Sequence, residues 1–234
     1  MRPLRGQLLL EAWERGAAGS ALTRPLALLE AASPGLRGED WPDLSMAERD
    51  QNLFRLRQIT FGDGLRGVLP CEACSTRMEF EISVDSILHR GELRHEAVWS
   101  SGAFTFVLRA VTTRDLAEAV AAPDPRRRLL ELCMIVDGVE TPKAVADHEE
   151  AAVAEFNRLN AGAETRFTLP CPACREVTHA DLDIGKFLWV EVRHAALTLL
   201  REVHDLASAY GWAERDILGM NGARRSMYLE MVRA

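Results

Sequence analysis

The chain has 234 residues, and its 28 Lys and Arg against 35 Asp and Glu leave a formal net charge of −7 at pH 7. Non-specific affinity for nucleic acid comes mainly from clustered basic residues, so this balance argues against a phosphate-tracking protein. Five cysteines are too few for a disulfide-built secreted scaffold, and no stretch approaches the roughly 18 apolar residues of a membrane span. We expect a cytoplasmic protein without a membrane span.

The first 60 residues predict a helical region. Apolar residues recur at helical spacing over residues 4–16 and 22–32, and the charged residues inside the first stretch indicate a helix rather than a signal peptide. Ser45 to Glu48 has the sequence of a capping box, which predicts a helix that reaches about Ile59. Residues 33–44, with two prolines and two glycines, are the expected linker.

A repeat displaced by 100 residues is the strongest internal signal. Leu69-Pro70-Cys71-Glu72-Ala73-Cys74 returns as Leu169-Pro170-Cys171-Pro172-Ala173-Cys174. A short strand-like run precedes each pair, and alternating apolar residues follow it, regularly from Met78 and more loosely from Val177. Each copy therefore predicts a strand, a CxxC turn and a second strand, over residues 61–89 and 161–185.

The remaining segments predict an insertion and a helical C-terminal unit. Within residues 90–160 we expect a strand at 103–111, a short helix capped by Thr113, a helix from Pro125 that includes Cys133 and Ile135, and a helix from Pro142. Cys133 lies among leucines, which is typical of a small core residue. Residues 186–234 predict a long helix to about residue 210 and two short helical pieces, 212–220 and 223–232.

The two CxxC pairs predict one four-cysteine metal site made of Cys71, Cys74, Cys171 and Cys174. Four thiolates in a tetrahedron suit Zn²⁺, and they leave no open position for water, so the site is expected to be structural rather than catalytic. A rubredoxin-like iron site uses the same four ligands, and the spacing alone does not distinguish it from a zinc site. A redox CxxC pair would lie at the start of a helix, whereas a strand-like pattern follows both pairs here, so redox chemistry is disfavoured. The remaining alternative is two unrelated buried cysteine pairs without a metal.

Catalytic motifs are missing from the sequence. It contains no Gly-rich phosphate loop, no GxSxG and no HExxH, and its histidines are not spaced as a metal pair. We therefore expect neither an enzyme nor a small-molecule substrate. A zinc-ribbon regulator that binds nucleic acid is the alternative function. The strands after the cysteines disfavour it, because they carry more carboxylates than basic side chains, namely Glu79, Glu81, Asp85, Asp181 and Asp183 against Arg77 and Lys186.

Several segments together resemble a known family. They are the sequence LRQITFG at 56–62, Leu108-Arg109 with TTRDL at 112–116, Leu129-Leu130 near Cys133, and a closing pattern of Tyr210-Gly211-Trp212, Glu214, Asp216-Ile217-Leu218, Arg224-Arg225 and Tyr228-Leu229. This order is similar to the baseplate hub assembly chaperone family of contractile-tailed phages and its relatives in contractile injection systems, over most of residues 5–232. The resemblance implies a non-enzymatic structural or assembly protein whose partners are hub, spike, wedge or tube subunits.

One detail of this chain departs from that family, and another extends the expectation. Such families often have glycine after the second cysteine of a knuckle, whereas this chain has Ser75 and Arg175, which predicts a left-handed turn that is strained or absent. The pattern of the C-terminal piece favours packing on the long helix, and the resemblance adds a partner-binding role in which Arg224 and Arg225 face an acidic surface. The candidate partner residues are Trp212, Ile217, Leu218, Arg224, Arg225, Tyr228 and Leu229.

The sequence thus predicts an α+β protein, mainly helical, built around a four-cysteine zinc ribbon that is made of two distant β-hairpin knuckles. The cofactor is one structural Zn²⁺, and the partners are baseplate or tail subunits rather than nucleic acid.

Overall fold

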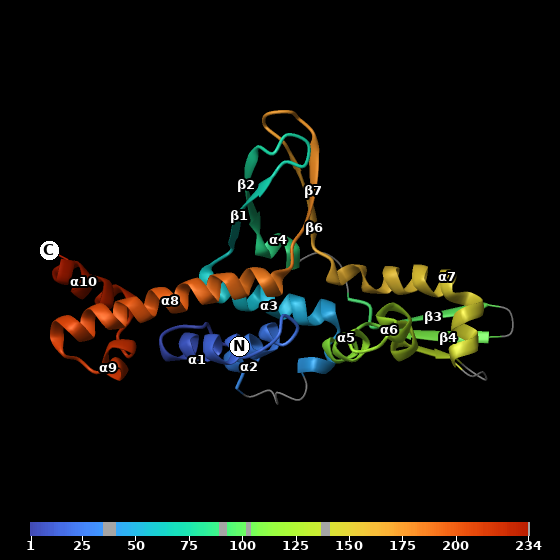
Figure 1. Ribbon diagram of the computed structural model, residues 1–234, viewed down its shortest axis with the longest axis horizontal. Helices are drawn as coiled ribbons and strands as arrows, with labels where there is room; N and C mark the ends of the chain where they lie inside the picture. Colours follow the sequence, from blue (N-terminus) through green and yellow to red (C-terminus); the bar gives the residue numbers. More distant parts are fainter. Residues whose placement is uncertain (35–40, 89–92, 102–103, 137–140, 234) are drawn as a thin grey trace. The chain divides into compact units, whose positions relative to one another are not determined.

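The computed structural model describes residues 1–34, 41–88, 93–101, 104–136 and 141–233 (Figure 1). The protein is a mixed α+β chain that is mostly helical, as predicted. Within those ranges, no helix combines the length and the apolar composition that crossing a membrane requires. Half of the predicted linker at 33–44, residues 35–40, lies outside the described residues, and residues 41–43 form a short 3-10 helix.

The chain divides into two compact units. Unit 1 consists of Met1–Arg37, Leu56–Gly62 and Ile184–Ala234, and unit 2 consists of Gly38–Arg55 and Asp63–Asp183. The helices at the two ends of the sequence therefore belong to the same unit, while both cysteine pairs belong to the other.

Unit 1 is helical. Its elements are α1 (Gln7–Ala17), α2 (Arg24–Ala32), the last residues of α3 (Met46–Phe61), α8 (Ile184–Tyr210), α9 (Glu214–Leu218) and α10 (Gly222–Arg233). The long helix α8 is confirmed, and its apolar stripe is buried against α1, α2, α9 and α10.

Two contacts fix the helices of unit 1 on α8. Gly16 of α1 lies so close to α8 that a Cβ built there would be 2.4 Å from the Trp189 ring, so this crossing requires glycine. Arg57 is buried and makes a two-bond ion pair with Glu191, with N···O distances of 3.1 and 2.9 Å. Its guanidinium also donates to the Gly62 carbonyl oxygen at 2.6 Å. The end of α3 is thereby joined to α8 by a charged pair with two parallel hydrogen bonds.

Unit 2 contains the two predicted hairpins. They are formed by β1 (Gly64–Pro70) with β2 (Arg77–Ser83), and by β6 (Arg166–Pro170) with β7 (Val177–Asp181). Both are antiparallel, and each turn between the strands contains one CxxC pair. The loose apolar alternation that starts at Val177 does not follow the buried face of the second hairpin. Val177 is 51 % exposed, and Thr178 points inward because it is the residue opposite Leu169 in the register.

The rest of unit 2 is a three-stranded antiparallel sheet with helices. The sheet has the order β3 (Glu96–Ser101), β4 (Phe104–Arg109), β5 (Met134–Val136), and α7 (Thr141–Asn160) packs on one face of it. The strand predicted at 103–111 is confirmed as β4, whereas β3 was not predicted. The helix predicted through Ile135 is wrong there, because α6 (Pro125–Cys133) ends before it and Ile135 pairs with Val107 of β4.

Helix starts in unit 2 follow the sequence closely. The capping box at α3 is confirmed, since Ser45 Oγ accepts from the Glu48 N–H at 3.2 Å and Glu48 Oε2 accepts from the Ser45 N–H at 3.0 Å. The cap of α5 (Thr113–Val120) is one residue earlier than predicted, at Thr112, because Asp115 completes a second capping box there. Short elements complete the unit: η1 (Trp41–Asp43), α4 (Val84–Leu88) and η2 (Ala161–Ala163).

Candidate metal centre

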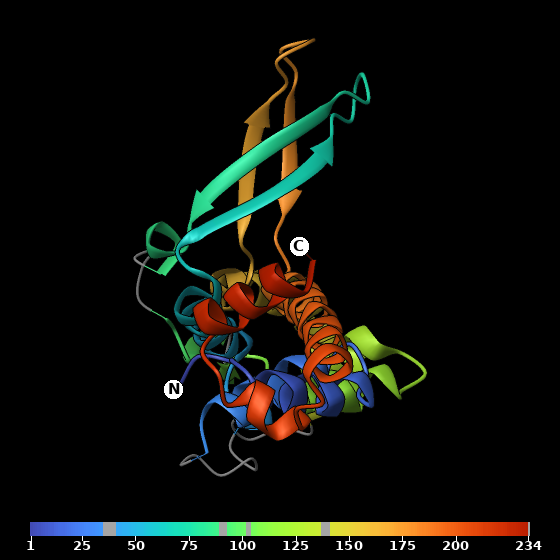
Figure 2. The same cartoon turned by 90° about the vertical axis from the view of Figure 1, so that its left-hand side faces the viewer.

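The two hairpins lie side by side, with the cysteine turns at their far ends (Figures 1 and 2). They form separate two-stranded sheets, so side chains rather than strand hydrogen bonds join them. Phe80 of β2 contacts Phe167 of β6, with ring centroids 4.9 Å apart. Below the turns, a small apolar cluster contains Cys71, Cys171, Met78, Leu69 and Leu169.

The contact between the two phenylalanines depends on a reciprocal difference between the repeats. In the first hairpin Gly67 is opposite Phe80, and in the second Phe167 is opposite Ala180. Each hairpin therefore contributes one large and one small residue at equivalent positions. A Cβ at Gly67 would lie 2.5 Å from the Phe80 ring, so the small residue provides the space that the ring occupies.

The two CxxC turns have the same backbone geometry. The Cys71 N–H donates to the Thr76 carbonyl at 2.8 Å, and the Ser75 N–H donates to the Cys71 carbonyl at 2.9 Å. The second turn repeats both bonds at the same lengths, with Cys171, Arg175 and Glu176 in the equivalent places. The repeated sequence thus produces two copies of one local structure.

The residue after the second cysteine adopts the left-handed conformation in both turns. Ser75 has φ 60° and Arg175 has φ 68°, and these are the positive-φ residues other than glycine in the described part of the chain. The sequence predicted a left-handed turn that is strained or absent, and the structure shows that the turn is present. A side chain in this region costs about 1–2 kcal/mol, and the hydrogen bonds of the turn hold it there.

The four sulfur atoms form one cluster. All of them lie within 4.8 Å of one another, and the Sγ atoms are 3.6 Å apart both for Cys71 with Cys174 and for Cys74 with Cys171. A tetrahedral site with Zn–S bonds of about 2.3 Å has sulfur atoms about 3.8 Å apart. The donor set and its spacing therefore fit a tetrahedral four-thiolate metal site.

Hydrogen bonds to sulfur support this interpretation. The Cys74 N–H donates to Cys71 and lowers the pKa of that thiol. The Thr76 hydroxyl, with Oγ1 3.3 Å from Cys74 Sγ, and the Thr76 N–H lower the pKa of Cys74 to about 6. At Cys174 the Glu176 N–H acts to lower the pKa, but the neighbouring thiols outweigh it and raise the pKa to about 12. Four sulfurs this close cannot all lose their protons without a cation among them, which a divalent metal would supply.

The fifth cysteine is separate from this cluster. Cys133 is fully buried, and burial raises the pKa of its thiol to about 12. Its Sγ lies 3.8 Å from Asp115 Oδ2, and Arg109 forms a two-bond ion pair with the same carboxylate. The expectation of a small core residue is confirmed.

One repeated feature of the hairpins was not noticed in the sequence. Arg66 is opposite Glu81 and pairs with it at 2.9 Å, and Arg166 is opposite Asp181 and pairs with it at 2.7 Å. Both pairs are displaced by 100 residues, so comparing charged residues at that displacement would have revealed them. All four side chains are mostly exposed, so the pairs support the register more than the stability.

The predicted partner residues fall into an inner and an outer group, all within unit 1. Ile217, Leu218 and Leu229 are buried, so they hold α9 and α10 against α8. Arg225 is also turned inward: Nε lies 2.6 Å from Glu202 of α8, and the guanidinium donates to the Met220 carbonyl at 3.2 Å. The expectation that Arg225 faces outward is wrong, because its guanidinium pairs with the Glu202 carboxylate on α8.

The outer group is aromatic. Trp212 stacks on Tyr210 with centroids 4.5 Å apart and meets Tyr228 edge-on at 4.9 Å. The Arg224 guanidinium lies 5.7 Å from the centre of the Tyr228 ring, and this side chain is exposed, as expected. Of the two predicted arginines, only Arg224 therefore remains available to a partner.

Comparison with models of protein families, with curated proteins and with solved structures finds no match for this chain. We therefore infer function from the chemistry of the cysteine cluster and from the exposed surfaces. Within the described residues, the four cysteines are also the one group of three or more His, Cys, Asp or Glu side chains close enough to hold a metal ion.

Proposed function

We propose that the protein is a non-enzymatic, zinc-stabilised structural or assembly protein of the baseplate of a phage-tail-like contractile particle. The observation that carries the proposal is the closed four-sulfur cluster, which joins two hairpins that are 100 residues apart in the chain. Four protein sulfurs leave no coordination position for a substrate or a water molecule, so such a site stabilises a fold instead of performing chemistry.

The particle is proposed from the order of motifs in the sequence. The segment LRQITFG, the TTRDL segment and the closing pattern from Tyr210 to Leu229 occur in the order that resembles the baseplate hub assembly family. A rigid adaptor fits this role, because a metal fixes the hairpins while the helices offer surfaces to hub, spike, wedge or tube subunits. The proposed chain therefore acts through contacts with other proteins.

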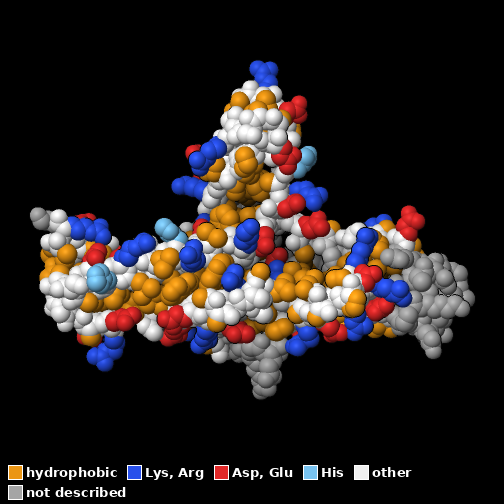
Figure 3. All heavy atoms as spheres, viewed as in Figure 1, with side chains coloured by type: hydrophobic (Ala, Val, Ile, Leu, Met, Phe, Trp, Pro, Cys, Tyr) orange, Lys and Arg blue, Asp and Glu red, His pale blue; other side chains and the backbone are white. Residues whose placement is uncertain are grey.

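The charge of the hairpins favours this function over regulation through nucleic acid. From β1 through β2 and from β6 through β7 there are four arginines against five carboxylates, and two of the arginines are paired across the strands. On the face in Figure 3, acidic and basic side chains both surround the hairpins, and no basic patch covers them. A zinc ribbon that binds phosphates would need a basic face.

The metal is tested first. Protein purified without chelator should contain one equivalent of zinc per chain, and X-ray absorption should show four sulfur ligands at about 2.3 Å. Iron in place of zinc would change the cofactor but keep the structural role. Absence of metal, or two metals per chain, would contradict the shared site.

The particle is tested by affinity purification. The tagged protein, expressed at its native level in cells that assemble the particle, should recover tail-tube, spike, hub or wedge subunits, identified by mass spectrometry. The matched control is the Cys174→Ser variant, which should lose these subunits together with the metal. Recovery of DNA fragments with no tail subunit would instead support the regulatory function.

A further inference from the structure

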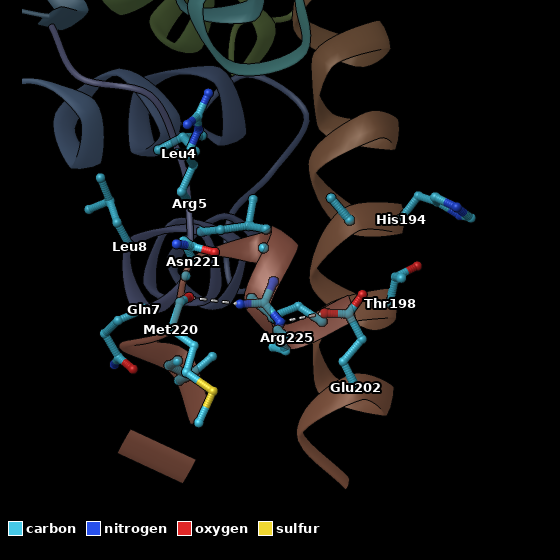
Figure 4. Close-up of a pocket in the computed structure, with 16 residues that line it drawn as sticks. Leu4, Arg5, Gln7, Leu8, His194, Thr198, Glu202, Met220, Asn221 and Arg225 are labelled. Carbon is cyan, nitrogen blue, oxygen red and sulfur yellow. Dashed lines mark hydrogen bonds and ion pairs between the residues drawn. The ribbon is translucent and has the colours of Figure 1, made fainter. Parts of the chain in front are cut away.

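A groove in unit 1 lies away from the metal centre. It has a volume of about 680 Å³ and is bordered by the start of α1, the middle of α8 and the turn from α9 to α10 (Figure 4). Segments from both ends of the sequence and from the long helix therefore build one concave surface. Neither the cysteine cluster nor the hairpins contribute to it.

The floor of the groove consists of buried apolar side chains. Leu4, Leu9, Leu199 and Leu218 line it, and each is at most 7 % exposed. Gly6 has φ 53°, and a Cβ there would be 3.0 Å from the Leu218 carbonyl oxygen. The chain before α1 can pass this close to α9 because the residue is glycine, and this close passage shapes the groove.

The polar residues of the groove leave one free positive charge. Arg225 lies across the groove in Figure 4, and its guanidinium is satisfied by Glu202 and the Met220 carbonyl. Arg5 also lines the groove and is exposed, and within the described part of the chain it has no carboxylate partner. An occupant would therefore meet leucines below and an unpaired guanidinium at the rim.

The two units differ strongly in charge. Unit 1 has 13 Lys and Arg against 9 Asp and Glu, a net charge of +4, whereas unit 2 has 15 against 26, a net charge of −11. The groove thus belongs to the basic part of a chain that is acidic as a whole. Charge of one sign around an apolar site favours partners of the opposite sign and raises their rate of association.

We propose that this groove binds an acidic segment of a partner protein, which inserts an apolar side chain between α1, α8 and α10 and places a carboxylate beside Arg5. A protein segment fits better than nucleic acid, because the floor offers leucines instead of basic or stacking side chains. The inference goes beyond the proposed function, since it depends neither on the metal nor on the kind of particle.

The test uses the full-length, metal-loaded protein and a displayed library of random peptides as the probe. Selection on the wild type, with counter-selection on an Ala195→Phe variant that fills the groove, should enrich peptides with a large apolar residue flanked by Asp or Glu. By fluorescence polarisation, Arg5→Glu should weaken these peptides about tenfold. Arg15→Glu makes the same charge change in the last turn of α1, outside the groove, and should leave affinity within about twofold.

Several results would overturn the proposal. No enriched peptide, enriched peptides without acidic residues, or equal losses in Arg5→Glu and Arg15→Glu would exclude a specific acidic partner in the groove. Binding of a single-stranded oligonucleotide that is lost in Arg5→Glu would assign the surface to nucleic acid. Self-association in sedimentation velocity that Arg5→Glu abolishes would make a second copy of the chain the occupant. None of these results bears on the metal content, so failure here is distinguishable from failure of the proposed function.

Discussion

Removing one cysteine ligand should loosen both hairpins, although the substitution lies in only one of them. Cys174→Ser replaces a thiolate in the turn between β6 and β7 with a weaker oxygen ligand. Because β1 and β2 share no strand hydrogen bonds with β6 and β7, we expect the proposed metal and a few apolar contacts to hold the hairpins together. An isolated two-stranded hairpin is marginally stable in water, so neither should persist alone.

The magnitudes predict that the proposed metal would dominate this junction. The Phe80–Phe167 contact contributes about 0.5–1.5 kcal/mol. Burial of Met78 contributes about 1.5–3 kcal/mol, and the half-buried Leu69 and Leu169 add about as much again between them. Structural zinc contributes about 10–16 kcal/mol of apparent binding free energy. A quarter of that, about 2.5–4 kcal/mol, is the minimum cost we expect for losing one of four ligands.

Hydrogen exchange measured by mass spectrometry can detect this loss strand by strand. A drop of about 2.5–4 kcal/mol in the free energy of local opening raises amide exchange by about two to three orders of magnitude. We expect that increase in β1 and β2 as well as in β6 and β7 of the Cys174→Ser protein. Metal analysis of the same sample should show the loss of zinc.

Cys133→Ser is the matched control, because it makes the same atomic change in a buried cysteine outside the cluster. It should cost about 1–3 kcal/mol of global stability through burial of a hydroxyl, with zinc content unchanged and no selective increase in hairpin exchange. If Cys174→Ser increased exchange in β6 and β7 alone, the two CxxC pairs would not share a metal, and the ribbon described here would be wrong.

Three further predictions concern other parts of the chain. Ser75→Gly should raise the free energy of unfolding by about 0.5–1 kcal/mol because φ is positive there, whereas Ala73→Gly in the same turn should lower it, and equal signs in urea titrations would contradict the turn geometry. Burial raises the pKa of Asp50 to about 6, so its protonated form favours folding below about pH 4 and that gain is lost as the pH rises through 6. The free energy of unfolding of the Asp50→Asn protein, relative to that of the wild type, should therefore rise by up to about 3 kcal/mol between pH 4 and pH 7. A difference that is independent of pH would refute this. Arg225→Ala should lower the free energy of unfolding by about 1–2 kcal/mol, since it leaves Glu202 without its cation. An unchanged melting temperature would show that the pair does not contribute to stability.

Local sequence patterns determined the parts of the structure that depend on neighbouring residues. The 100-residue repeat predicted both hairpins and the four cysteines whose sulfur atoms cluster, because a CxxC turn is formed by six consecutive residues. The helical stripe of α8 and the capping box at Ser45 were predicted for the same reason, since periodicity and capping act within a few turns of the chain.

Tertiary structure decided the features whose partners are distant in the sequence. The short strands β3 and β5 exist because β4 lies between them, and three residues beside Cys133 carry no strong strand signal of their own. Arg225 turns inward because Glu202 of α8 lies within reach, and the groove beside it exists because the start of α1 meets the end of α9. Pairing across such distances depends on which surfaces meet during folding, and a single sequence records that choice only weakly.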